Sequence, residues 1–213
     1  MSRTDLIAQG LTPHVAASAA AAALAAFWGE PEMKALRLWR SQALQDDLAL
    51  VADALGRGEE VLPSLREALA APRRVLAEEY ERLFVGPGTV PCPPYEALWR
   101  KDRPKLEEGT VVGAVTGRVA DLYDDIGVRM RKELRELPDH VSAEWEAVAY
   151  GLQAGEPQSA AACELLGEHL AVWLPPLCAK VREAAKLPFY ERVASLTDSW
   201  LPALVEVLGC ASL

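Results

Sequence analysis

Helical periodicity runs along almost the whole chain, and it limits the possible folds more than any other feature. Apolar residues recur every three or four positions, whereas long alternating β-branched runs and Asn-Gly hairpin turns do not occur. Helices are expected near residues 13–28, 31–55, 63–70, 72–84, 110–126, 141–153, 157–185 and 188–208. One core suffices for 213 residues, and no fixed-period repeat indicates a solenoid. We therefore predict an all-α fold, a single-domain helical bundle spanning residues 1–213.

Proline and polar residues set the expected helix ends. Asp139 lies just before the helix that starts near Val141 and is a natural N-cap for it. Pro175 and Pro176 should kink or interrupt the helix expected over residues 157–185, because proline lacks the backbone N–H.

A stretch dense in Pro and Gly, residues 86–109, separates the two halves of the helical pattern. Loops longer than about 15 residues inside a compact domain are usually functional or disordered. This one contains Tyr95 and Trp99, which favour an ordered structure. We predict a long functional loop here.

The overall charge and the apolar runs exclude some partners. The net charge of −9 would repel a phosphate backbone, so no nucleic acid partner is expected. The Ala-rich run over residues 15–28 is too weakly hydrophobic for an anchor and is interpreted as a packed helix. No run is long enough to span a bilayer, so we expect no stable membrane insertion.

The four cysteines, Cys92, Cys163, Cys178 and Cys210, show no C-x-x-C spacing. In a chain of this length such scattered cysteines are typical of buried thiols in a reducing compartment. No recognised metal-ligand spacing occurs, and nucleotide-binding glycine loops are missing too. We expect neither a metal nor a cofactor.

Three segments share the pattern of one family. Residues 80–88 read YERLFVGPG, followed by PPYEALW at 93–99; residues 136–144 read ELPDHVSAE; HLAVWLP at 169–175 is followed by PFYERVASL at 188–196. In this order they resemble the signatures of the TorD/DmsD/NarJ family of molybdoenzyme maturation chaperones. The resemblance extends from Tyr80 to Trp200, and Ala97 replaces the usual Ser.

The resemblance implies an all-helical cytoplasmic chaperone and not an enzyme. Such chaperones bind the twin-arginine leader of a molybdoenzyme catalytic subunit, or in some branches another part of that subunit. They hold the client for cofactor insertion and folding before export. The resemblance allows either a monomer or a domain-swapped homo-oligomer.

A twin-arginine leader presents two guanidinium groups followed by an apolar stretch, so its receptor needs carboxylates beside an apolar groove. We expect that groove between the loop over residues 86–99 and the helix start over residues 139–145. The candidate peptide-binding residues are Leu83, Phe84, Gly86, Pro87, Pro94, Tyr95, Glu96, Trp99, Glu136, Pro138, Asp139, His140 and Glu144.

Each candidate also has a structural interpretation. Leu83 and Phe84 fit a core, Gly86 fits a turn, and Asp139 fits a helix cap whose carboxylate is unavailable to a ligand. Two other functions are open: a helical adaptor unrelated to molybdoenzymes, or a small enzyme that uses Asp139 and His140 as acid and base.

Overall fold

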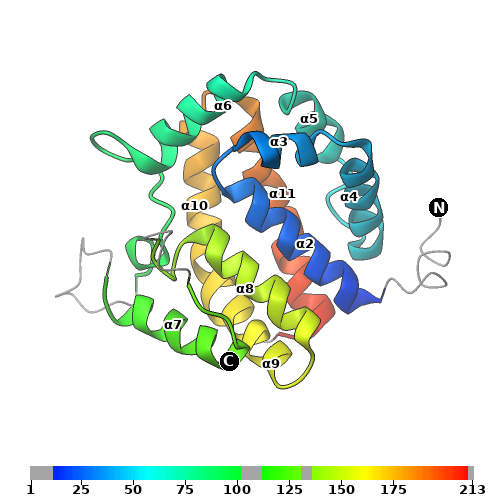
Figure 1. Ribbon diagram of the computed structural model, residues 1–213, viewed down its shortest axis with the longest axis vertical. Coiled ribbons are helices and arrows are strands. Elements are labelled where there is room, and N and C mark those ends of the chain that lie inside the picture. The colour runs from blue at the N-terminus through cyan, green and yellow to red at the C-terminus, as the bar shows by residue number, and fades with distance from the viewer. Residues whose placement is uncertain (1–11, 102–111, 131–135, 211–213) are drawn as a thin grey trace.

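Helices make up the regular structure of the chain, a computed structural model of which describes residues 12–101, 112–130 and 136–210. In chain order the elements are α2 (Pro13–Trp28), α3 (Met33–Trp39), α4 (Gln42–Leu55), α5 (Leu62–Ala68), α6 (Arg73–Tyr80), the π turn η1 (Glu81–Val85), the 3-10 turn η2 (Glu96–Leu98), α7 (Ala114–Ile126), α8 (Val141–Ala154), α9 (Gln158–Glu164), the π turn η5 (Leu165–Leu170), α10 (Ala171–Ala184) and α11 (Pro188–Leu208). These three ranges contain no strand, which confirms the all-α prediction (Figure 1).

The Ala-rich helix α2 crosses the middle of the bundle and packs along α8, α11 and α4 (Figure 1). Six of its nine alanines are buried, and their small side chains let the neighbouring helices approach closely. Ser18 donates a hydrogen bond to the carbonyl of Ala149 in α8 (3.0 Å), and Trp28 Nε1 donates to Thr197 Oγ1 in α11 (3.0 Å). The Ala-rich run over residues 15–28 is therefore a core helix, as predicted.

One expected helix is divided into two, and one expected interruption does not occur. The helix expected over residues 31–55 is broken into α3 and α4, because the Ser41 hydroxyl accepts the amide of Leu44 and caps a new helix (3.2 Å). The prolines Pro175 and Pro176 do not interrupt α10. The neighbouring side chain of Trp173 is fully buried, and such tertiary packing outweighs local propensity.

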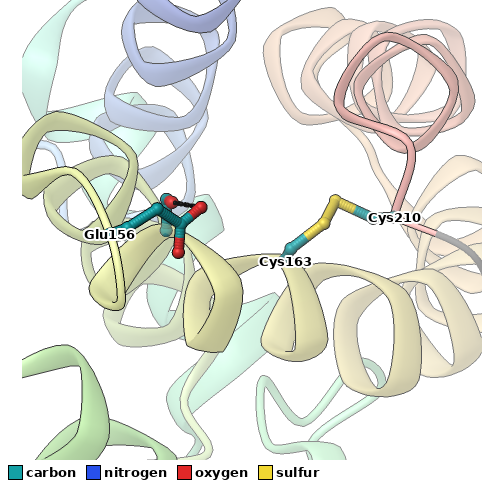
Figure 2. The surroundings of a disulfide bond; sticks show 4 residues. Glu156, Cys163 and Cys210 are labelled. Carbon is teal, nitrogen blue, oxygen red and sulfur yellow. Dashed lines mark hydrogen bonds between the residues drawn. A yellow bond between two sulfur atoms is a disulfide. The ribbon is translucent and has the colours of Figure 1, made fainter.

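The cysteines form a disulfide, which corrects the prediction of four thiols. Cys163 of α9 is bonded to Cys210, which follows α11, and their Cα atoms lie 5.3 Å apart (Figure 2). The bond ties the end of the last helix to α9. Cys92 and Cys178 are buried free thiols, as expected.

No helix in the described ranges is long and apolar enough to cross a bilayer. The described part of the Pro- and Gly-rich loop runs from residue 86 to residue 101, and α7 follows from Ala114. Residues 102–109 of the expected loop lie outside the described residues. The described part of the loop pairs with the residues at the start of α8, and several of the candidate residues lie there.

Candidate functional site

The loop begins at a backbone turn that only glycine adopts readily. Gly86 follows the π turn η1 with a φ of +114°, and the bond to Pro87 is cis. The chain then returns along η1, where the amide of Cys92 donates to the carbonyl of Leu83 (3.0 Å). Leu83 is fully buried, so its side chain belongs to the core and does not reach a ligand.

Backbone pairing fastens the loop to the start of α8. Tyr95 and His140 form an isolated antiparallel bridge, and the amide of Val141 donates to the carbonyl of Pro94 (2.9 Å). The aromatic rings of Tyr95 and His140 meet edge to face, with their centroids 5.4 Å apart. The PPYE and LPDH segments, distant in sequence, are thus neighbours in space.

A hollow of about 450 Å³ lies between η1, the loop and the start of α8, and we call it the loop groove. It is lined by Tyr80, Phe84, Val85, Val90, Pro93, Pro94, Tyr95, Leu98, Glu136 and His140. Its walls are aromatic, proline and aliphatic side chains, with one carboxylate and one imidazole among them. Five predicted site residues therefore come together: Phe84, Pro94, Tyr95, Glu136 and His140.

Glu136 is the only carboxylate among the described residues that line the loop groove. Its Oε1 accepts hydrogen bonds from the Tyr95 hydroxyl (2.7 Å) and from the amide of Leu137 (3.2 Å). Its Oε2 makes no hydrogen bond within the described part of the chain. Burial and this bond to a carboxylate both raise the pKa of Tyr95, so its hydroxyl remains a donor.

His140, and not Asp139, caps α8, which corrects the capping prediction. Its Nδ1 accepts the amide of Ser142 (3.2 Å) and contacts Ser142 Oγ (2.8 Å). Burial lowers the pKa of His140, which favours the neutral ring that accepting at Nδ1 requires.

Beneath the loop lies a buried polar network that holds the other predicted carboxylates. Glu96 accepts from Arg100 Nη1 (2.9 Å) and pairs with His169 Nδ1 (2.8 Å). Arg100 also donates to the carbonyl of Glu168 (2.7 Å) in the π turn η5. The network therefore ties the loop to η5.

Asp139 and Glu144 complete this network, and neither is exposed to solvent. Asp139 Oδ2 accepts the amide of Ala97 (3.1 Å), and Glu144 Oε2 accepts Trp173 Nε1 (3.2 Å). Asp139 Oδ1 and Glu144 Oε1 have no hydrogen-bond partner among the described residues.

Burial controls the ionisation of these two carboxyls. It raises the pKa of Asp139 to about 6, although the Ala97 amide acts in the opposite direction. It raises the pKa of Glu144 well above the usual range, and the neighbouring carboxyl of Glu96 adds to this effect. The neutral form of Glu144 is therefore favoured, as expected for a buried carboxyl close to other carboxyls.

The remaining predicted residues lie outside the loop groove. Trp99 donates from Nε1 to the carbonyl of Pro93 (2.7 Å) and lines a separate hollow beside Val172 of α10. The carbonyl of Pro138 accepts the Tyr123 hydroxyl (2.6 Å) and so fixes the backbone before α8. Both contribute to the shape of the site from its edge.

Some residues of the candidate site and of the network beneath it were not predicted. Tyr80 lines the loop groove one helical turn before Phe84, a spacing that signals a shared face. Arg100 is four residues after Glu96 in sequence, which is a pairing signal of the same kind. Nothing in the sequence singles out His169 as the partner of Glu96, because that contact is tertiary.

The geometry defines an all-α protein with an aromatic groove that contains one accessible carboxylate. The family model for the nitrate reductase delta subunit matches residues 40–179, and the chain belongs to that family. The resemblance drawn from the three segments is thereby confirmed.

Two curated relatives carry chaperone names. The chain is 29% identical to the Tat proofreading chaperone DmsD of Salmonella typhi over 122 residues, covering 57% of this chain and 56% of that protein. It is 27% identical to the chaperone protein TorD of Shewanella pealeana over 135 residues, covering 62% of this chain and 60% of that protein. These matches therefore span less than two thirds of either relative.

A solved structure shares the fold. The crystal structure of a candidate redox enzyme maturation protein from Archaeoglobus fulgidus superposes with a TM-score of 0.57, at 21% identity, over 85% of this chain and 91% of that chain. This similarity shows the helical arrangement.

Proposed function

We propose that this protein is a cytoplasmic chaperone that binds a molybdoenzyme subunit through its twin-arginine leader. It holds the client while the cofactor is inserted and the subunit folds, before export. Its membership of the nitrate reductase delta subunit family and its similarity to two proteins named as chaperones support this proposal. In this proposal it is a binding protein and not an enzyme.

The observation that carries the proposal is the position of Glu136 in the loop groove. A half-buried carboxylate, whose Oε2 makes no hydrogen bond within the described residues, lies beside walls of Phe84, Pro94 and Tyr95. A guanidinium can donate to that oxygen while the apolar residues that follow it in the leader cover the aromatic walls. Charge-assisted hydrogen bonds of this kind contribute about 1.5–3 kcal/mol.

Isothermal titration of the intact protein with the leader of the molybdoenzyme encoded beside its gene tests this function. We expect saturable binding that weakens when the Arg pair is replaced by Lys, because Lys cannot form the bidentate contact. The variant Glu136→Gln should weaken binding at least about tenfold, the equivalent of about 1.4 kcal/mol. The matched control is Glu164→Gln on α9, an exposed glutamate far from the loop groove in sequence.

Binding of the leader with equal affinity by wild type and Glu136→Gln would reject Glu136 as the acceptor. The absence of any leader binding would favour one of two alternatives: a helical adaptor unrelated to molybdoenzymes, or a chaperone that binds another part of its client. The enzyme alternative has little support, since Asp139 is fully buried and the imidazole of His140 is occupied with capping α8.

The disulfide bears on the proposed cytoplasmic location. Structural disulfides are rare in the reducing cytosol, yet Cys163 and Cys210 are bonded in this structure. Thiol titration of denatured protein, trapped with alkylating agent on cell lysis, would count the reduced cysteines. Two reactive thiols would show that the bond forms in the cell, and four would show that it does not.

A further inference from the structure

A second hollow adjoins the loop groove on the far side of Glu136. It has a volume of about 460 Å³, and we call it the outer groove. The described residues that line it are Tyr123, Val128, Arg129, Met130, Glu136, Ser142, Ala143, Glu146, Ala147 and Tyr150. Glu136 lines both hollows, so its carboxylate stands at the boundary between them.

One face of α8 forms the wall of the outer groove. Ser142, Glu146 and Tyr150 are spaced four residues apart and therefore share a helix face. From Ser142 to Tyr150 the helix rises about 12 Å. An extended peptide advances about 3.3 Å per residue, so roughly four residues can lie along this wall.

The charge of the outer groove favours a basic occupant. Glu136 and Glu146 both line it, and Glu146 is exposed. Among the described residues that line it, the one cation is Arg129, which forms an exposed ion pair with Asp124 (3.8 Å). The Tyr150 ring is 52% exposed, which is unusual for an aromatic side chain, and it offers a face to a cation.

The two hollows differ in chemistry, and this difference matches the order of groups in the proposed ligand. The loop groove is largely aromatic and aliphatic, whereas the outer groove has two carboxylates and an exposed tyrosine. A twin-arginine leader has its cationic residues first and its apolar stretch after them. A ligand lying across Glu136 would place one type of residue in each hollow.

We propose that the outer groove is a second subsite, which binds the basic segment that precedes the apolar stretch of the leader. One arginine lies at Glu136, between the grooves. The other lies against Glu146 and the Tyr150 ring, and the apolar stretch enters the loop groove. This inference rests on the proposed function and adds the direction in which the leader lies.

Fluorescence anisotropy with a labelled synthetic peptide, an Arg-Arg pair followed by an apolar stretch, tests this subsite in the intact protein. We expect Glu146→Gln to weaken binding of this peptide about tenfold, as the loss of one charge-assisted contact predicts. Tyr150→Ala should weaken it by about threefold, because cation–π contacts at exposed sites are weaker. Glu164→Gln is the matched control and should change nothing.

A second series of peptides identifies the pairing. When the first Arg of the peptide is replaced by Gln, the Glu146→Gln substitution should have almost no further effect. When the apolar stretch is replaced by Ser, Glu146→Gln should keep its full effect. Equal losses with every peptide would overturn the assignment, because they would show no specific pairing with the first Arg.

The two proposals fail in different ways. If Glu136→Gln weakens binding and Glu146→Gln does not, the outer groove is no subsite, and the leader-binding function stands. If the wild-type protein does not bind the Arg-Arg peptide, both proposals are overturned. Both glutamates lie at least partly on the surface, so circular dichroism should show folded variants.

Discussion

The segment at residues 136–144 contains three carboxylates in two opposite environments. Glu136 lies at the rim of two hollows, and its Oε2 has no hydrogen-bond partner in the described part of the chain, whereas Asp139 and Glu144 are fully buried beneath the loop. The sequence distance between them is small, but the start of α8 turns the later side chains inward. Identical chemical groups in one motif therefore have different surroundings: only the carboxylate at the rim is open to a ligand, and the buried ones contact the protein's own backbone and side chains.

The difference has an energetic basis. A carboxylate at the rim stays partly hydrated and can exchange water for a guanidinium at little cost. A buried carboxylate must be neutral or paired, and Glu96 is paired with Arg100 and His169. Substitutions in the network should therefore change stability, while substitutions at the rim should change affinity.

The largest effect is expected at Glu96. Glu96→Ala removes the carboxylate that faces Arg100 and His169, and Arg100 is only 11% exposed. Loss of one partner of a buried ion pair costs about 3–5 kcal/mol of unfolding free energy. Urea denaturation followed by circular dichroism measures this loss.

The rim carboxylate provides the contrast for that measurement. Glu136→Gln should change the unfolding free energy by less than about 1 kcal/mol, as for other partly exposed positions. If both variants lost the same stability, the division between rim and network would be wrong.

The next effect is a pH dependence centred on Asp139. Its pKa is about 6 in the folded protein, above the ordinary value of 3.8. Between about pH 4 and pH 6 the folded state thus binds more protons than the unfolded state, and stability falls as pH rises. Above pH 6 this contribution is constant.

Asp139→Asn should remove this slope, because the amide is neutral at every pH and its oxygen can still accept the Ala97 amide. Relative to wild type, the variant should gain up to about 3 kcal/mol as the pH rises from 4 to 7. Urea titrations at four pH values test this, with Glu164→Gln as the control. Parallel pH profiles for wild type and Asp139→Asn would show that Asp139 ionises freely.

A smaller effect is expected at the hydrogen bond that orients the rim carboxylate. Tyr95→Phe removes the hydroxyl that donates to Glu136 (2.7 Å) but keeps the ring against His140. We expect a loss of about 1 kcal/mol in stability and a few-fold weaker leader binding. Stronger binding by this variant would mean that Tyr95 competes with the incoming guanidinium.

Much of the fold could be predicted from the periodicity and the capping residues of the sequence. The Ala-rich run was predicted to be a packed helix, and Leu24, Phe27 and Trp28, which share one face of α2, are all buried. The break between α3 and α4 was missed, because a serine inside an apolar pattern signals a cap only weakly. The disulfide between Cys163 and Cys210 was not predicted either, because it depends on where α9 and α11 end in space.

The candidate site could be predicted from the sequence only in part. Motif residues at Tyr95 and His140 do meet, because strand-like pairing joins the two loops that carry them. The sequence does not show which carboxylate faces outward, because Glu136 and Glu144 have the same charge and lie in the same motif. Glu144 is buried because of its position on α8 and its contact with Trp173 of α10, whereas Glu136 lies before that helix.

The smallest effect should be at Glu144, although this residue is completely buried. Burial raises the pKa of Glu144 well above its usual range, which favours the neutral carboxyl there. Glu144→Gln replaces one neutral polar group by another of the same shape, and its oxygen can still accept Trp173 Nε1. The unfolding free energy at pH 7 should change by less than about 1 kcal/mol. A loss comparable to that of Glu96→Ala would show that Glu144 is ionised in the folded protein.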